Sequence, residues 1–146
     1  TALLVIDVQN DFCPAGALAV VGGNEIIPHI NEEMAKYDCV VLTQDWHPKG
    51  HSSFATSHEG KNPLELIKMP YGDQVLWPDH CIQGSKGAEF HPDLNIEQAN
   101  AIIRKGANPF IDSYSAFFEN CRTFKPNTRL LMQKSEPRFG ESARQK

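Results

Sequence analysis

The chain has 146 residues, a formal net charge of −4 and a hydrophobic fraction of 40%, which is typical of one globular domain with its own core. The acidic balance argues against a nucleic-acid-binding surface, and no apolar stretch approaches the ~20 residues of a membrane-spanning helix. The chain opens on an apolar segment without a charged leader, and its four cysteines show no CxxC spacing. We therefore expect reduced thiols and a cytoplasmic protein.

Three short apolar runs along the chain predict strands. Runs without polar alternation are typical of parallel strands that are buried on both faces. The expected strands begin near Leu3, Val40 and Ile102.

A helix is expected between the first two strands. From Asn24 to Tyr37 apolar residues recur at helical spacing, and Asn24 is a suitable N-cap that follows two glycines. A strand, a helix and a parallel strand form one βαβ unit with a right-handed crossover. The sequence therefore predicts an α/β fold with a mainly parallel sheet.

A charged residue follows each predicted strand: Asp7, Asp45 and Lys105. In parallel α/β sheets, ligands bind in the crevice beyond the carboxyl ends of the strands, so the three residues are expected to share one crevice. The stretch from Asp45 to Lys105 contains five prolines and is expected to be mostly irregular. A connection of this length is usually functional.

The pattern Asp45-Trp46-His47 predicts part of a metal site. A carboxylate and an imidazole two residues apart on an extended segment project to the same side. His80, in the segment 77–81, can add a third ligand from a loop. Three ligands of mixed N and O type with open positions are typical of catalytic metal sites and suit Zn, Fe or Mn. The alternative is a turn-capping aspartate with two ordinary loop histidines, and the rigid aromatic and proline neighbours favour the metal.

These motifs together resemble the nicotinamidases, which belong to the isochorismatase-like cysteine hydrolases. The likeness runs from Thr1 to about Asn120. The segments that carry it are Asp7 to Cys13, Gly16 to Val20, Asp45 to Pro48, Trp77 to Cys81, Lys105-Gly106 and Asp112 to Phe117. The resemblance implies a doubly wound, Rossmann-like three-layer α/β fold with helices on both faces of a mainly parallel sheet. It also implies hydrolysis of nicotinamide to nicotinate and ammonia in NAD salvage.

The resemblance assigns Asp7 and Lys105 to the catalytic triad of the family. A carboxylate beside an ammonium stays ionised and can accept a proton from a thiol, and the ammonium lowers the pKa of a nearby thiol. The implied metal ligands are Asp45, His47 and His80. The implied aromatic walls of the nicotinamide pocket are Phe12, Trp77 and Tyr114. His51 is a candidate to support the ligands from behind or to replace one of them.

The resemblance does not extend to the end of the chain. The nucleophilic cysteine of the family lies well beyond the lysine, after a further strand, and this chain ends at Lys146. Seven basic and two acidic residues give the segment 122–146 a net charge of +5, against −9 for the residues before it. We therefore expect an incomplete isochorismatase-like hydrolase domain over residues 1–121 and a basic tail over 122–146 that does not match the family.

Three functions remain open at this point. Cys13, Cys81 and Cys121 are expected to be packed small residues rather than nucleophiles. The chain is then a nicotinamide amidase whose cysteine lies beyond its end, a metalloamidase that uses metal-bound hydroxide, or a truncated non-catalytic binder of metal and pyridine. In each case the expected partner is a small molecule, with no nucleic acid and no membrane, and a homo-oligomer is compatible with the sequence.

Overall fold

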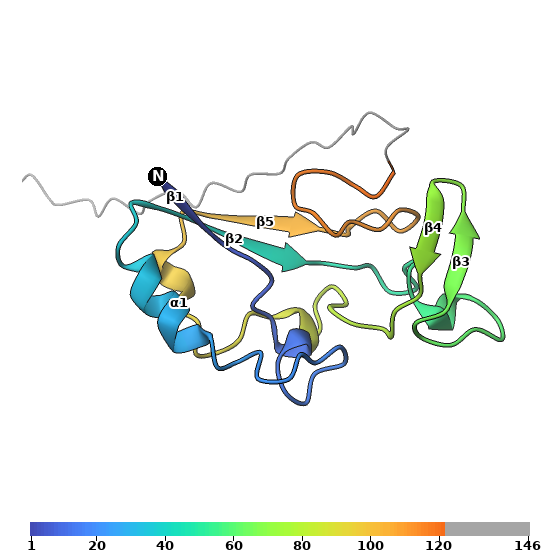
Figure 1. Ribbon diagram of the computed structural model, residues 1–146, viewed down its shortest axis with the longest axis horizontal. Coiled ribbons are helices and arrows are strands. Elements are labelled where there is room, and N and C mark those ends of the chain that lie inside the picture. The colour runs from blue at the N-terminus through green and yellow to red at the C-terminus, as the bar shows by residue number, and fades with distance from the viewer. Residues whose placement is uncertain (122–146) are drawn as a thin grey trace, which may run out of the picture.

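A three-stranded parallel sheet organises residues 1–121, the part of the chain that the computed structural model describes (Figure 1). Its strands are β1 (Ala2–Val5), β2 (Cys39–Asp45) and β5 (Ala101–Lys105), and β2 lies between the other two. The three expected strand positions and the parallel pairing are confirmed. The basic tail expected over 122–146 lies outside the described residues.

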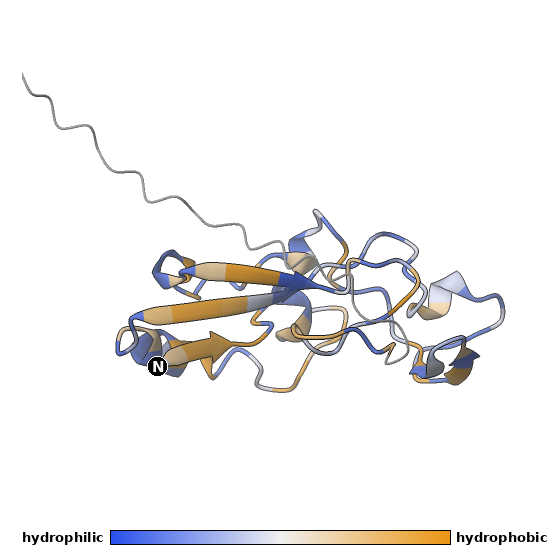
Figure 2. Ribbon diagram, turned by 90° about the horizontal axis from the view of Figure 1, so that it is seen from above, coloured by the Kyte–Doolittle hydropathy of each residue, from blue (hydrophilic) through white to orange (hydrophobic). Residues whose placement is uncertain are grey.

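The register of the sheet brings the charged strand ends to one edge. Val5 at the end of β1 pairs with Leu42, whereas Asp45 at the end of β2 pairs with Lys105 at the end of β5. β2 therefore continues past the point where β1 leaves it. Figure 2 shows apolar strand bodies that turn polar at the carboxyl ends of β2 and β5.

One helix, α1 (Ile27–Met34), packs against one face of this sheet (Figure 1). Its buried ends, Ile27 and Met34, join Val5, Val40 and Leu42 in the core cluster. Val40 and Leu42 are two positions apart on β2, so their side chains lie on the same face of the sheet. That face, together with Val5 of β1, contributes to the core.

The predicted N-cap of the helix is wrong. The helix begins at Ile27, its cap is Ile26 without a side-chain hydrogen bond, and a proline occupies the first turn. Asn24 contributes its carbonyl, which accepts the N–H of Ile27 at 3.2 Å. Proline fixes φ at a value suited to a first helical turn, and this backbone signal decides the start here.

The other face of the sheet is less covered within residues 1–121. Leu4 and Ile6 are 45% and 56% exposed, although both belong to the first apolar run. In the same part of the chain, α1 is the one α-helix. The described residues thus place an α-helix on one face of the parallel sheet and leave Leu4 and Ile6 exposed on the other. None of their helices is long and apolar enough to cross a membrane.

The long connection between β2 and β5 is mostly irregular, with one hairpin and three short 3₁₀ helices, η2 (Ala55–Ser57), η3 (Lys86–Ala88) and η4 (Ile96–Gln98). β3 (Leu66–Met69) and β4 (Gly72–Val75) pair antiparallel around Pro70 and Tyr71. The hairpin was missed because its residues lie in a proline-rich stretch and its strands are short. It ends just before Trp77, so it leads directly into the loop that carries His80.

Candidate active site

Lys105 lies between two carboxylates at the sheet edge. Its Nζ is 2.9 Å from Oδ2 of Asp7 and also donates to Oδ1 of Asp45. Burial disfavours the ammonium, but the two carboxylates outweigh burial and raise the pKa of Lys105. The lysine is therefore a stable cation, and the structure brings together the three residues expected in one crevice.

Asp7 is held by a residue that sequence reasoning missed. The Thr43 hydroxyl donates to Oδ1 of Asp7 at 2.6 Å and accepts the Asp7 N–H at 3.1 Å. These bonds support a backbone φ of 52° at Asp7, a left-handed conformation that is uncommon for residues other than glycine. In this conformation the Asp7 carboxylate lies 2.9 Å from the Lys105 ammonium.

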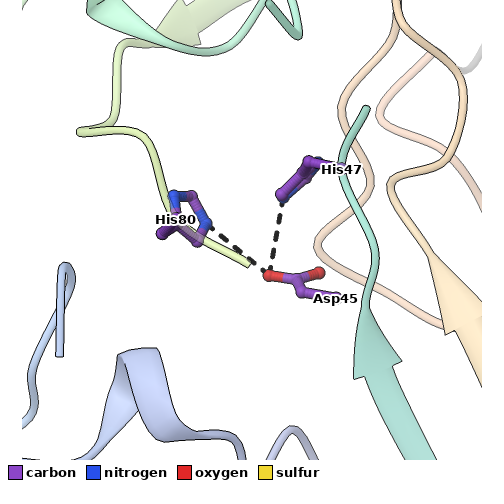
Figure 3. A group of neighbouring side chains, drawn as sticks. All are labelled: Asp45, His47 and His80. Carbon is purple, nitrogen blue, oxygen red and sulfur yellow. Dashed lines mark ion pairs between the residues drawn. The ribbon is translucent and has the colours of Figure 1, made fainter. Parts of the chain in front are cut away.

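The three expected metal ligands converge on one point (Figure 3). Oδ2 of Asp45 lies 3.6 Å from Nε2 of His47 and 3.7 Å from Nε2 of His80. All three side chains are buried, and one ligand atom from each lies within 4.8 Å of the others. Asp45 therefore faces the lysine with one oxygen and the two histidines with the other.

The ring nitrogens that face away from Asp45 determine the chemistry of those that face it. Nδ1 of His47 is 3.0 Å from the carbonyl of Gly106, and Nδ1 of His80 is 2.8 Å from the carbonyl of Pro78. A carbonyl only accepts, so each Nδ1 carries a proton, and each ring in its neutral form presents the lone pair of Nε2 toward Asp45. Two lone pairs and a carboxylate oxygen around one point fit a divalent cation.

Neighbouring groups keep the Asp45 carboxylate ionised. Burial disfavours the charge, but His47, His80 and Lys105 outweigh burial and hold the pKa of Asp45 well below its usual range. Burial also disfavours a charged His80, yet Asp45 and the Pro78 carbonyl outweigh it and raise the pKa of His80. A proton on His80 is thus the competitor of a metal ion.

His51 lies behind the cluster and is not available as a ligand. Its Nε2 is 2.8 Å from the carbonyl of Asn108, and its Nδ1 accepts from the N–H and hydroxyl of Ser53 at 3.2 and 2.7 Å. Although His47, His51 and Asp112 also lie within ligand reach of one another, both nitrogens of His51 are already used. Burial and His47 lower the pKa of His51, and its ring packs 4.5 Å from that of His47.

The three expected aromatic walls take part in two different ring contacts. The Phe12 ring is 5.7 Å from the His80 ring, whereas Trp77 and Tyr114 contact each other edge to face at 6.3 Å. Tyr114 is 55% exposed. Sequence reasoning missed Phe54, which is fully buried with its ring 5.4 Å from His47 and 5.5 Å from His80.

The cysteines expected to be packed residues are buried. Cys13, Cys81 and Cys121 are each at most 5% exposed, while Cys39 at the start of β2 is exposed. Burial raises the pKa of the Cys13 thiol. At Cys81, burial and the nearby carboxylates outweigh the Lys105 ammonium and raise the pKa as well. A raised pKa is the opposite of what a thiolate nucleophile needs.

Comparison with known proteins places this geometry in a family context. The model of the isochorismatase domain matches residues 1–120. The nicotinamidase of Acinetobacter baylyi is 57% identical over 118 residues, which are 81% of this chain and 55% of that protein.

Two solved structures extend the comparison. A nicotinamidase and pyrazinamidase from Acinetobacter baumanii matches with a TM-score of 0.82 and 60% identity, over 84% of this chain and 59% of that one. The pyrazinamidase of Pyrococcus horikoshii in complex with zinc matches with a TM-score of 0.62 and 41% identity, over 80% and 57%. The chain thus spans little more than half the length of these relatives.

Proposed function

Because this chain belongs to the isochorismatase family, we propose that it acts as a metal-assisted amidohydrolase of the nicotinamidase type, which converts nicotinamide to nicotinate and ammonia. The observation that carries the proposal is the Asp45 carboxylate, which faces the Lys105 ammonium with one oxygen and the two imidazole lone pairs with the other. The residues proposed for proton transfer and those proposed for substrate orientation then lie next to each other at the carboxyl end of the sheet.

Asp7 and Lys105 are the proposed catalytic pair. The Asp7 carboxylate, fixed by Thr43 and Lys105, would accept the proton of an attacking thiol and later return it to the leaving ammonia. Lys105 would lower the pKa of that thiol. The buried Cys13 and Cys81 have raised pKa values, so the mechanism requires a different thiol beside Lys105.

Asp45, His47 and His80 are the proposed ligands of a divalent zinc, iron or manganese ion. The neutral imidazoles and the carboxylate suit these metals, and the zinc complex of the Pyrococcus relative supports the choice. When bound, the ion would supply a positive charge that attracts the pyridine nitrogen of nicotinamide. Phe12, Trp77 and Tyr114 are the proposed walls that stack on the flat ring and exclude water.

We further infer the setting of this site. The exposed Leu4 and Ile6 support a doubly wound arrangement, in which helices cover both faces of the sheet. No disulfide links the described Cys13, Cys39 and Cys81, which supports a reducing, cytoplasmic location.

Ligand binding tests the proposal directly. Titration calorimetry of the zinc-loaded chain should detect nicotinamide, and benzamide, which has the same shape without the ring nitrogen, should bind at least tenfold more weakly. In His80→Ala the preference for nicotinamide should disappear, because one of three metal ligands is gone. Equal binding of both amides to the unmodified chain, or no binding of either, would overturn the assignment.

A further inference from the structure

We propose that Gln9 and Asp11 are positioning residues of the candidate metal centre, which hold the main chain at Asp45 and next to His80 in the geometry that the ligands require. The inference rests on the metal binding in the proposed function and is independent of amidase activity. Neither residue contacts the ligand atoms themselves, and both act through backbone groups.

Gln9 acts on Asp45 as a substitute for a neighbouring strand. Its Oε1 accepts the Asp45 N–H at 2.7 Å, and its Nε2 donates to the Asp45 carbonyl at 2.9 Å. β1 pairs with β2 only as far as Leu42, so no main chain of β1 covers Asp45. The side-chain amide supplies the donor and the acceptor that a further strand residue would supply.

The Gln9 amide is itself fixed in place. Its second N–H donates to the carbonyl of Ala88 at 2.8 Å, and the residue is fully buried. Three hydrogen bonds in a site without solvent leave the amide a single orientation. Gln9 therefore fixes the Asp45 main chain, and with it the direction of the carboxylate, on the side that β5 does not cover.

Asp11 acts on the other half of the cluster. Its Oδ2 accepts the N–H of Cys81, the residue after His80, at 2.7 Å, and its Oδ1 accepts the N–H of Ala17 at 3.1 Å. Cys81 has a φ of 46°, a strained value for a residue with a side chain. The Cys81 carbonyl accepts the N–H of His47 at 3.0 Å. Cys81, which Asp11 holds through its N–H, thus joins the two histidine loops through its carbonyl.

The close packing around Asp11 supports this role. A Cβ added at Gly87 would lie 2.0 Å from Oδ2 of Asp11, so the carboxylate packs directly against the Gly87 backbone and any side chain there would displace it. Phe12, the next residue, contacts the His80 ring. The segment 9–12 therefore contacts both the Asp45 side and the His80 side of the cluster from one short stretch of chain.

Zinc affinity of the full chain, measured against a competing chromophoric chelator, tests the inference. Gln9→Met keeps the length of the side chain and removes its hydrogen bonds. We expect it to weaken zinc binding about 10- to 100-fold, the usual effect of losing a residue that orients a ligand. Gln44→Met is the matched control. Gln44 is buried and donates to the same Ala88 carbonyl at 2.8 Å, but it does not bond the Asp45 main chain, so zinc affinity should change less than threefold.

The outcomes separate this inference from the proposed function. No zinc binding by the unmodified chain refutes the metal site and the inference together. If Gln9→Met binds zinc as tightly as the unmodified chain, the inference is refuted and the metal site is not. The same holds if Gln44→Met loses as much zinc affinity as Gln9→Met. Should Gln9→Met fail to fold by circular dichroism, Asp11→Asn decides instead. Its amide repels one of the two N–H groups, so at least a tenfold loss of zinc affinity is expected, and unchanged affinity would overturn the inference.

Discussion

The Lys105 ammonium lies 2.9 Å from Oδ2 of Asp7, although the strands that lead to these residues do not pair with each other. β2 separates them, and the end of β2 contributes Asp45 as the second carboxylate on the same lysine. One buried cation therefore holds the carboxyl ends of three strands together.

Replacing Lys105 with Met should destabilise the fold. It leaves Asp7 and Asp45 close together without a cation, and breaking a buried ion pair from one side typically costs about 3–5 kcal/mol of unfolding free energy. Urea denaturation measures the loss. In the double variant Asp7→Asn/Lys105→Met, a neutral amide replaces one of the two carboxylates left without a cation, so part of the stability should return. A single variant as stable as the unmodified chain contradicts the buried triad.

Zinc stoichiometry should report one site. The Asp45/His47/His80 cluster predicts about one divalent ion per chain by elemental analysis after dialysis. His80→Ala should lose most of it because it removes one of three ligands. His58→Ala is the control, because it removes a half-buried histidine that does not belong to the cluster. The Nε2 of His58 contacts the Ser52 carbonyl instead. Full retention of the ion in both His80→Ala and Asp45→Ala would show that the site is wrongly assigned.

Zinc affinity should fall as the pH is lowered. The metal needs the neutral form of His80, whose pKa is raised by Asp45. Below this raised pKa, His80 carries a proton that zinc must displace. As the pH is lowered, zinc affinity should therefore begin to weaken at a pH above about 6.5, the ordinary histidine pKa. Calorimetry in two buffers of different ionisation enthalpy counts the released protons. A zinc affinity that is constant from pH 8 to pH 5.5 would contradict the raised pKa.

Turnover by the 146-residue chain should be very slow. Loss of a covalent nucleophile usually lowers the rate by several orders of magnitude, and Cys13 and Cys81 are buried thiols with raised pKa values. Ammonia release from nicotinamide, compared with that of a full-length relative, measures the difference. Cys39→Ser removes the exposed thiol as a labelling background. Rapid ammonia release from Cys39→Ser that iodoacetamide abolishes would identify one of the buried cysteines as the nucleophile.

Exposed apolar residues on the face of the sheet opposite α1 should promote self-association. Leu4 and Ile6 are exposed on it, and exposed apolar surface on a sheet favours contacts between copies. Light scattering should detect species larger than 16.3 kDa, and Ile6→Lys should reduce them. Val21→Lys, which alters a fully exposed loop residue, should have less effect. A monomer at all concentrations would contradict this prediction.

The sequence alone determined the parts of this protein that depend on local patterns. Apolar runs without alternation located β1, β2 and β5, and the charged residues that follow them lie at one sheet edge, as their position after parallel strands predicts. The two-residue spacing of Asp45 and His47 placed both on one side of an extended segment. These inferences succeed because strand periodicity and residue chemistry are properties of neighbours in sequence.

The tertiary structure alone decided how the site is held. Thr43 reaches Asp7 across 36 positions and Asp11 reaches Cys81 across 70, and no local pattern encodes such contacts. The Nδ1 partners of His47 and His80 selected the nitrogen that faces Asp45, and the partners of His51 removed it from the ligands. Burial makes each of these bonds necessary, because a polar group without water must find its partner wherever the fold brings one.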